Sequence, residues 1–200
     1  MKSLTKNIAL NTAALLILTG VCVSKPLYAD GFGLKVGPNF GQAINNTGGL
    51  GKDGDHGGYN LGINYLTPKV GPVACLIEAG ILDMGFSLGQ YGNNFNTTIS
   101  CYDISIVGRT DLIGNTYFFA GGFVGFTNSA KLSYNSGAIT ADTRSYYKDT
   151  LTGYKAGFGA AFHNYEFELG WMSTVGGITK SDGYGVADIG SITLDFGYRF

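Results

Sequence analysis

Apolar and polar residues alternate strictly along the last stretch of the chain, residues 191–200. The apolar positions are Ile192, Leu194, Phe196, Tyr198 and Phe200, and Ser, Thr, Asp, Gly and Arg residues lie between them. A period of two predicts a β-strand with one apolar and one polar face.

The same alternation recurs along the chain and predicts eight strands. They lie near residues 31–40, 59–66, 72–86, 98–110, 117–128, 151–162, 165–172 and 191–200. The facing of 117–128 stays open, because both of its faces carry aromatic residues. The alternation is also irregular after Ile81, which indicates a β-bulge there.

Long and short connections follow one another regularly between these strands. The long ones are the polar loops 43–58, 87–97, 129–150 and 173–190, and the short ones are turns near 67–71, 111–115 and 163–164. Outer-membrane barrels have short periplasmic turns and long external loops, and an even strand count leaves both chain ends on one side. A soluble β-sandwich gives no reason for this regularity. The pattern therefore predicts an all-β fold, an eight-stranded antiparallel up-and-down transmembrane β-barrel.

The first 29 residues are predicted to be a secretory signal peptide. Lys2 and Lys6 precede an apolar segment, and Leu27-Tyr28-Ala29 is typical of a cleavage site, with cleavage between Ala29 and Asp30. We do not expect lipidation at Cys22, because Val21 stands where a lipoprotein signal has Gly, Ala or Ser. Residues 30–200 then form a single barrel domain in the bacterial outer membrane.

Composition narrows the choice of partners. Without Lys2, Lys6 and Lys25 the chain has 10 basic and 14 acidic residues, a net charge of −4, which argues against binding to nucleic acid. An apolar face with many of the 13 tyrosines and 13 phenylalanines is suited to outer-membrane lipid. The aromatic end of the chain resembles the signal read by the outer-membrane assembly machinery, which we assign to Phe196, Tyr198 and Phe200.

The opposite face of the strands carries charges of both signs and is predicted to point into the barrel. These residues are Lys35, Glu78, Asp103, Arg109, Lys155, Glu166, Glu168, Asp195 and Arg199. Buried charges need partners, and an eight-stranded barrel is only wide enough to be filled by side chains. We therefore expect an ion-pair network that fills the lumen; a narrow polar channel is the alternative.

No catalytic, metal or cofactor site is predicted. His163 falls in a turn, and His56 lies in the first loop beside Asp53 and Asp55, without a nearby serine. The two Asp residues lack the closing Glu of a calcium loop. Cys75 and Cys101 remain after processing, but they fall at opposite ends of a hairpin and on different faces, so we expect no disulfide between them.

Three segments resemble the PorT-like family of small outer-membrane barrels. They are Lys35 to Phe40, Phe118 to Phe126, and Ala156 to Phe162 continuing to Glu166, Leu169 and Trp171. The resemblance implies the barrel fold and an outer-membrane location, but no single activity. We expect a non-enzymatic structural or surface-display protein whose external loops bind a surface ligand. The alternatives are a narrow channel for ions or small solutes and an outer-membrane lipid-modifying enzyme.

Overall fold

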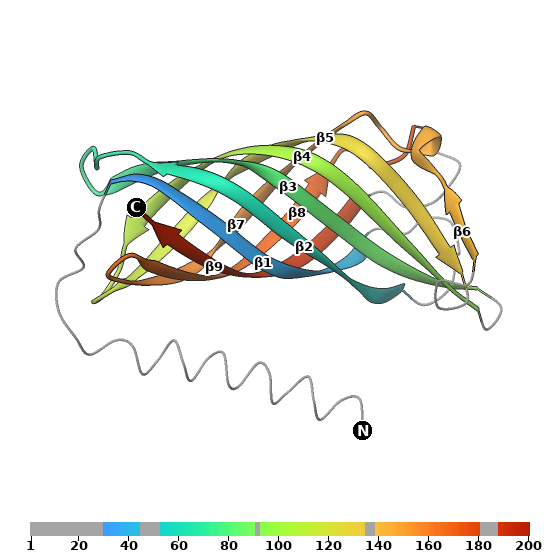
Figure 1. Cartoon of the computed structure of the whole chain (residues 1–200), viewed down its shortest axis with the longest axis horizontal. Helices are drawn as coiled ribbons and strands as arrows, with labels where there is room; N and C mark the ends of the chain where they lie inside the picture. The colour runs from blue at the N-terminus through green and yellow to red at the C-terminus, as the bar shows by residue number, and fades with distance from the viewer. Residues whose placement is uncertain (1–29, 45–52, 91–92, 135–138, 181–187) are drawn as a thin grey trace, which may run out of the picture.

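Eight long antiparallel strands form a closed barrel in the computed structural model, which describes residues 30–44, 53–90, 93–134, 139–180 and 188–200 (Figure 1). The strands are β1 (Gly31–Ile44), β2 (Asp53–Leu66), β3 (Val73–Gln90), β4 (Asn93–Asp111), β5 (Thr116–Tyr134), β7 (Thr150–Phe162), β8 (Tyr165–Val175) and β9 (Asp188–Arg199). Each pairs with its neighbours, and the pairing of β1 with β9 closes the ring. The predicted fold class is confirmed.

The barrel has two unlike ends. The short turns and the C-terminus lie at one end, here called the turn end, on the left of Figure 1. The opposite loop end carries the short strand β6 (Ile139–Asp142), which pairs with the end of β5, and a 3-10 helix at Arg144–Tyr146. The two-residue turn at His163 and Asn164 is confirmed, and His163 has a positive φ of 55°.

The strands extend further toward the loop end than the alternation predicts. β3 and β4 pair as far as Gln90 and Asn93, so most of the predicted loop 87–97 is a β-hairpin. β5 likewise continues to Tyr134, inside the predicted loop 129–150. Here both faces carry polar residues, so the period of two disappears from the sequence while backbone pairing continues.

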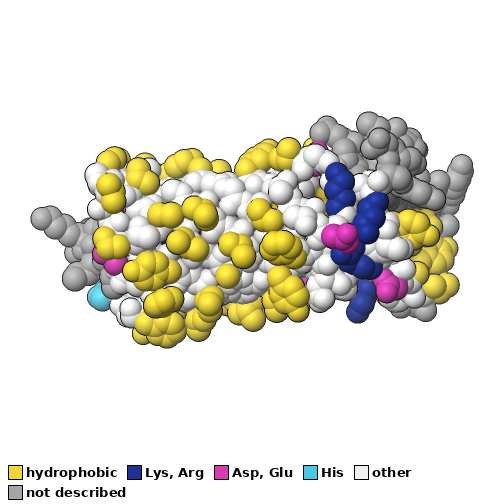
Figure 2. Space-filling model, turned by 90° about the horizontal axis from the view of Figure 1, so that it is seen from above, with side chains coloured by type: hydrophobic (Ala, Val, Ile, Leu, Met, Phe, Trp, Pro, Cys, Tyr) yellow, Lys and Arg dark blue, Asp and Glu magenta, His cyan; other side chains and the backbone are white. Residues whose placement is uncertain are grey.

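The outer surface of the barrel is apolar. Side chains predicted on the apolar face are widely exposed, among them Phe32 (64%), Ile106 (60%), Phe158 (56%) and Phe196 (41%). Figure 2 shows hydrophobic side chains spread over most of the barrel's length on the face in view. A closed barrel with this surface satisfies its backbone hydrogen bonds internally, as a hydrocarbon environment requires.

The facing of β5 is decided by its neighbours. Phe118 lies opposite Phe158 of β7 and points outward, so Tyr117, Phe119 and Phe123 point inward and are 0%, 4% and 4% exposed. Three aromatic rings therefore enter the lumen from one strand.

The predicted irregularity near Ile81 lies in the neighbouring strand. The register of β2 against β3 shifts between Asp55 and Asn60, so the extra residue belongs to β2. Beside it β1 approaches β3, and the Asn39 side chain donates a hydrogen bond to the Asp83 carbonyl at 2.6 Å. Glycine at position 58 permits this approach, since a Cβ there would lie 2.1 Å from the Asp83 oxygen.

Two further observations concern the described residues. None of their helices has the length and apolar character that crossing a membrane requires. Cys75 and Cys101 are free; Cys75 pairs with Gly108 in the β3–β4 register, whereas Cys101 pairs with Leu82.

Candidate functional site

The barrel interior brings together charged side chains from six strands. β1, β3, β4, β7, β8 and β9 contribute them, and each lies between outward-facing neighbours on its strand. All nine residues of the predicted network point into the lumen. Eight of them form ion pairs, in two groups.

The first group lies near the turn end and has Glu166 at its centre. Arg109 donates to one carboxylate oxygen of Glu166 at 2.5 Å, and Arg199 donates to the other at 2.7 Å. Arg199 also reaches the Gly31 carbonyl and the Asn64 side chain. Arg109, only 2% exposed, lies 3.4 Å from the centroid of the Tyr117 ring, a cation–π contact. Each buried charge here has a counter-charge within hydrogen-bonding distance.

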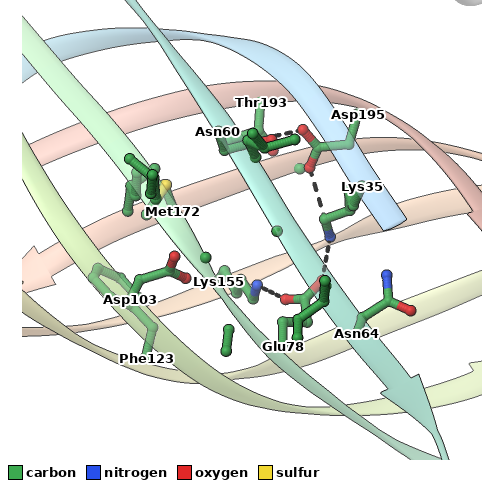
Figure 3. A pocket seen from close by; sticks show the side chains of 18 of the residues that line it. Lys35, Asn60, Asn64, Glu78, Asp103, Phe123, Lys155, Met172, Thr193 and Asp195 are labelled. Carbon is green, nitrogen blue, oxygen red and sulfur yellow. Dashed lines mark hydrogen bonds and ion pairs between the residues drawn. The ribbon is translucent and has the colours of Figure 1, made fainter. Parts of the chain in front are cut away.

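The second group lies in the middle of the barrel, around Lys35. Its ammonium group is 2.6 Å from Glu168, 3.7 Å from Asp195 and also pairs with Glu78. Lys155 pairs with the second oxygen of Glu78, as Figure 3 shows. The neutral partners are Ser105, which donates to Glu78, Tyr117, which donates to Glu168, and Asn60, which donates to Asp195.

Asp103 is the ninth residue, and it makes no ion pair with any residue that the structure describes. It borders a cavity of about 50 Å³ on the loop side of the second group. Lys35, Lys155 and Asp195 line one part of this cavity, and Phe123 and Met172 line another (Figure 3). The volume is enough for a few water molecules.

Inward glycines make room for the aromatic rings of β5. A Cβ at Gly159 would lie 2.3 Å from the Tyr117 ring, and one at Gly157 would lie 2.7 Å from the ring of Phe119. The glycine content of the barrel wall therefore has a local cause, because bulky rings on one strand face bare backbone on the next.

The loop end of the lumen is filled by an apolar cluster, here called the loop-side plug. Two of its members come from the connections between strands: Tyr147, 9% exposed, and Ile178, which is fully buried. The others project inward from the barrel wall and are Ala43, Leu82, Met84, Phe86, Ile99, Cys101, Phe123, Ala130, Leu151, Met172 and Ile189. Side chains thus fill this end of the barrel too.

Hydrogen bonds hold these two connections together. Lys148 N donates to Ile178 O, and Lys180 N donates to Tyr146 O, both at 2.9 Å. The exposed carboxylate of Asp149 accepts from Arg144 at 2.6 Å and from Lys180 at 3.3 Å. The hydrogen bond from Arg144, followed in size of effect by the one from Lys180, lowers the pKa of Asp149 below its ordinary value.

The remaining predicted residues lie apart from the lumen network. His56 contacts the Thr98 hydroxyl at 3.1 Å, and the described residues hold no metal-binding cluster of His, Cys, Asp or Glu. Phe196, Tyr198 and Phe200 point outward, and the rings of Tyr198 and Phe200 lie 5.6 Å apart. Asp30 is exposed, whereas Ala29 and the predicted signal peptide fall outside the described residues.

Sequence reasoning missed the aromatic and apolar part of the lumen. Tyr117, Phe119 and Phe123 alternate with regular spacing, but Phe118 and Phe126 on the other face obscured their direction. Tyr147 and Ile178 lie in segments without periodicity, so no local signal marks them as buried.

No protein-family model matches the chain, and no curated protein matches it. Solved structures do resemble it. Neisserial surface protein A (NspA) is 12% identical over 85% of this chain and 97% of that chain, with a TM-score of 0.53. Ail, the attachment invasion locus protein of Yersinia pestis, is 17% identical over 86% of this chain and 100% of that chain, with a TM-score of 0.49. The outer membrane protein OprG from Pseudomonas aeruginosa is 11% identical over 86% and 96% of the two chains, with a TM-score of 0.41. At 12% identity the likeness to neisserial surface protein A concerns the fold alone.

Proposed function

We propose that this protein is an integral outer-membrane barrel with a structural or surface-display role, in which the loops bind a surface ligand. The observation that carries the proposal is the filled lumen. Paired charges and aromatic rings occupy its turn side and middle, and the loop-side plug occupies the remainder. A barrel without a continuous passage is suited to holding its loops above the membrane, and loops supported by a rigid scaffold commonly carry binding residues.

The proposed orientation has the loop end outside the cell. The apolar outer surface is in contact with lipid, and the short turns face the periplasm. Residues 1–29 act as a cleaved signal peptide and direct the chain to export. The likeness of three segments to the PorT-like family belongs to the same proposal and supports the location rather than an activity.

The ligand-binding parts are then the connections within 43–58, 87–97, 129–150 and 173–190. Several of their described side chains are exposed although they are apolar, such as Ile139 at 61% and Tyr146 at 56%. These exposed side chains are the ones that a ligand at the loop end would contact.

Electrical measurement separates this function from a channel. We expect the purified protein, inserted into a planar lipid bilayer, to give no steady conductance, because paired charges and the aromatic rings of β5 occupy the middle of the lumen. Insertion is checked independently by the change in gel mobility on heating that folded barrels show. Reproducible single-channel steps from protein that has inserted would overturn the proposal.

A narrow channel for ions or small solutes is the second candidate, and the lumen cavity favours it. The cavity, which Asp103, Lys35 and Lys155 line, gives the middle of the barrel a small polar space. For a channel to exist, the loop-side plug would have to open. Conductance that appears only after Tyr147 and Ile178 are both replaced by Ala would support this candidate. No contact among the described residues favours the lipid-enzyme alternative.

The terminal strand supplies a second test of the location. Deletion of Phe200, which is 66% exposed, is expected to reduce the amount of folded barrel in the outer-membrane fraction. The matched control is Arg199→Lys, which changes the neighbouring inward residue and leaves the aromatic end intact. Equal membrane levels for the wild type and the deletion would contradict an assembly role of Phe196, Tyr198 and Phe200.

A further inference from the structure

The outward-facing cations gather in one place. Of the nine Lys and Arg residues that the structure describes, four point into the lumen and Lys69 lies at the turn end. The other four, Lys131, Arg144, Lys148 and Lys180, lie at the loop end and are here called the cationic belt. Figure 2 shows the belt crossing the molecule beside the hydrophobic surface. Asp142 and Asp149 accompany it, so the group has an excess of positive charge on a chain that is negative as a whole.

The belt lies next to the apolar surface in an ordered sequence of side chains. On β5 the outward residues run from Phe126 through Asn128 to Lys131, and on β7 they run from Tyr154 through Thr152 to Thr150, followed by Asp149 and Lys148. Phe126 and Lys131 pair with Tyr102 and Thr98 of β4, which are four positions apart. At about 3.3 Å per position and a tilt of about 40°, Lys131 therefore lies roughly 10 Å beyond Phe126 along the barrel axis. The order of aromatic, hydroxyl or amide, and charged groups matches the order from hydrocarbon to headgroup in a lipid leaflet.

A β-bulge directs Lys131 outward. The register between β4 and β5 shifts at Ser100 and Cys101, which leaves Asn128 without a partner in the ladder. Without that extra residue the alternation of β5 would point Lys131 into the lumen. Its exposed side chain forms no ion pair with any described residue, although its backbone lies opposite Asp142.

The four cations of the belt differ in how many of their hydrogen-bond donors are used within the protein. All three guanidinium nitrogens of Arg144 are used within the protein, by the Thr127 and Tyr147 carbonyls and by Asp149. Arg144 therefore positions the loop. Lys180 is 45% exposed, and the ammonium group of Lys148 makes one hydrogen bond, to the Gly176 carbonyl. Together with Lys131, these two lysines have donors left for a ligand.

We propose that Lys131, Lys148 and Lys180 bind the phosphate groups of anionic lipid headgroups in the leaflet at the loop end. The inference rests on the membrane location proposed above and adds a lipid class to it. A headgroup fits better than a soluble polyanion, because Lys131 points sideways from the wall at the level where headgroups lie. Lys131 and Lys148 directly follow the plug residues Ala130 and Tyr147, and Lys180 lies two positions after Ile178, so the closed plug places the three ammonium groups at the same end of the barrel.

The test compares how tightly two lipids bind to the protein in zwitterionic detergent micelles. Fluorescent phosphatidylglycerol and fluorescent phosphatidylcholine are titrated against the wild type and against the triple variant Lys131→Gln, Lys148→Gln, Lys180→Gln. We expect the wild type to prefer phosphatidylglycerol, and we expect that preference to fall about fivefold for each lysine replaced and to weaken with added salt. The triple variant Lys131→Arg, Lys148→Arg, Lys180→Arg should keep the preference for phosphatidylglycerol. The substitution Lys69→Gln, at the turn end, should not change this preference.

Three outcomes would overturn the proposal. One is equal binding of the two lipids by the wild type. Another is a preference that survives the triple variant. The third is lysine-dependent binding of a soluble sulfated oligosaccharide without a preference between the lipids, which would assign the belt to a soluble polyanion. Heat-shifted gel mobility and bilayer insertion are measured on every variant, so that failure of the barrel proposal is distinguished from failure of this one.

Discussion

The two ends of the lumen are filled in different ways. At the turn side and in the middle, the strands themselves supply the filling, which combines paired charges, such as Arg109 with Glu166 and Lys35 with Glu168, with apolar side chains of the strands. At the loop side the filling is apolar, and part of it comes from the connections, through Tyr147 and Ile178. The first arrangement belongs to the barrel wall and cannot separate from it. The second depends on two segments that fold back, so it is the end of the barrel that can open.

The largest expected effect is on the second group of ion pairs, around Lys35. Glu168→Ala removes the carboxylate that accepts from Tyr117 and one of the three carboxylates that pair with Lys35. Breaking a buried ion pair costs about 3–5 kcal/mol in a dry interior, and less here because Glu78 and Asp195 still pair with Lys35. The free energy of unfolding, measured by urea titration in lipid vesicles, should fall accordingly. Glu168→Gln is the control, because it keeps an acceptor for Tyr117 and should lose less. Wild-type unfolding midpoints in both variants would contradict a structural role for the pair.

The next effect is on the loop-side plug and should remain local. Ile178→Ala removes a fully buried side chain, at a cost of about 2–4 kcal/mol. Because the segment can open by itself, we expect proteolysis at the loop end to become faster by roughly 30-fold or more, while global unfolding changes little. Ile139→Ala, in an exposed position at the same end, should leave the cleavage rate unchanged. A global midpoint lowered as far as in Glu168→Ala would remove the distinction between the two ends.

A smaller loss of stability is expected from a substitution in the barrel wall beside Tyr117. Gly159→Ala places a methyl group against the Tyr117 ring, which must move away from Glu168, and such overpacking costs about 1–3 kcal/mol. Gly122→Ala is the matched control on an outward-facing site, where the nearest atom lies at an ordinary contact distance of 3.5 Å. Tyrosine fluorescence and the unfolding midpoint report the change. Identical stabilities for the two variants would mean that the Tyr117 ring is not confined as described.

The smallest effect concerns the exposed carboxylate that joins the connections. Because the pKa of Asp149 is lowered in the folded protein, its contribution is fully present above its ordinary pKa of 3.8 and is lost as the pH falls through the lower folded value. Hydrogen exchange of the Lys148 and Lys180 amides should therefore accelerate in that acidic range. In Asp149→Asn the exchange should already be faster at neutral pH and less dependent on acid. Exchange profiles that coincide with the wild type at every pH would show that Asp149 does not hold the connections.

Most of the wall could be predicted from the sequence, because one face of each strand lies on the apolar outer surface and the other face points into the lumen. Phe32, Tyr102 and Phe196 therefore point outward, and Lys35, Arg109 and Glu168 point inward, as the alternation indicates. The presence of counter-charges on the inner face could also be predicted. Which charges pair could not, since Lys35 lies 133 positions from Glu168 and only the stagger of the closed ring places them side by side.

The sequence by itself determined the eight strands, the facing of every strand except β5, and the inward placement of the charges, since these follow from a period of two acting over a few residues. Only the tertiary structure decided the direction of β5, the outward position of Lys131 beyond the bulge at Asn128, and the burial of Tyr147 and Ile178. Each of these depends on pairing with a neighbouring strand or on packing between distant segments. Such contacts leave no local period in the sequence, because the residues that make them are far apart along the chain.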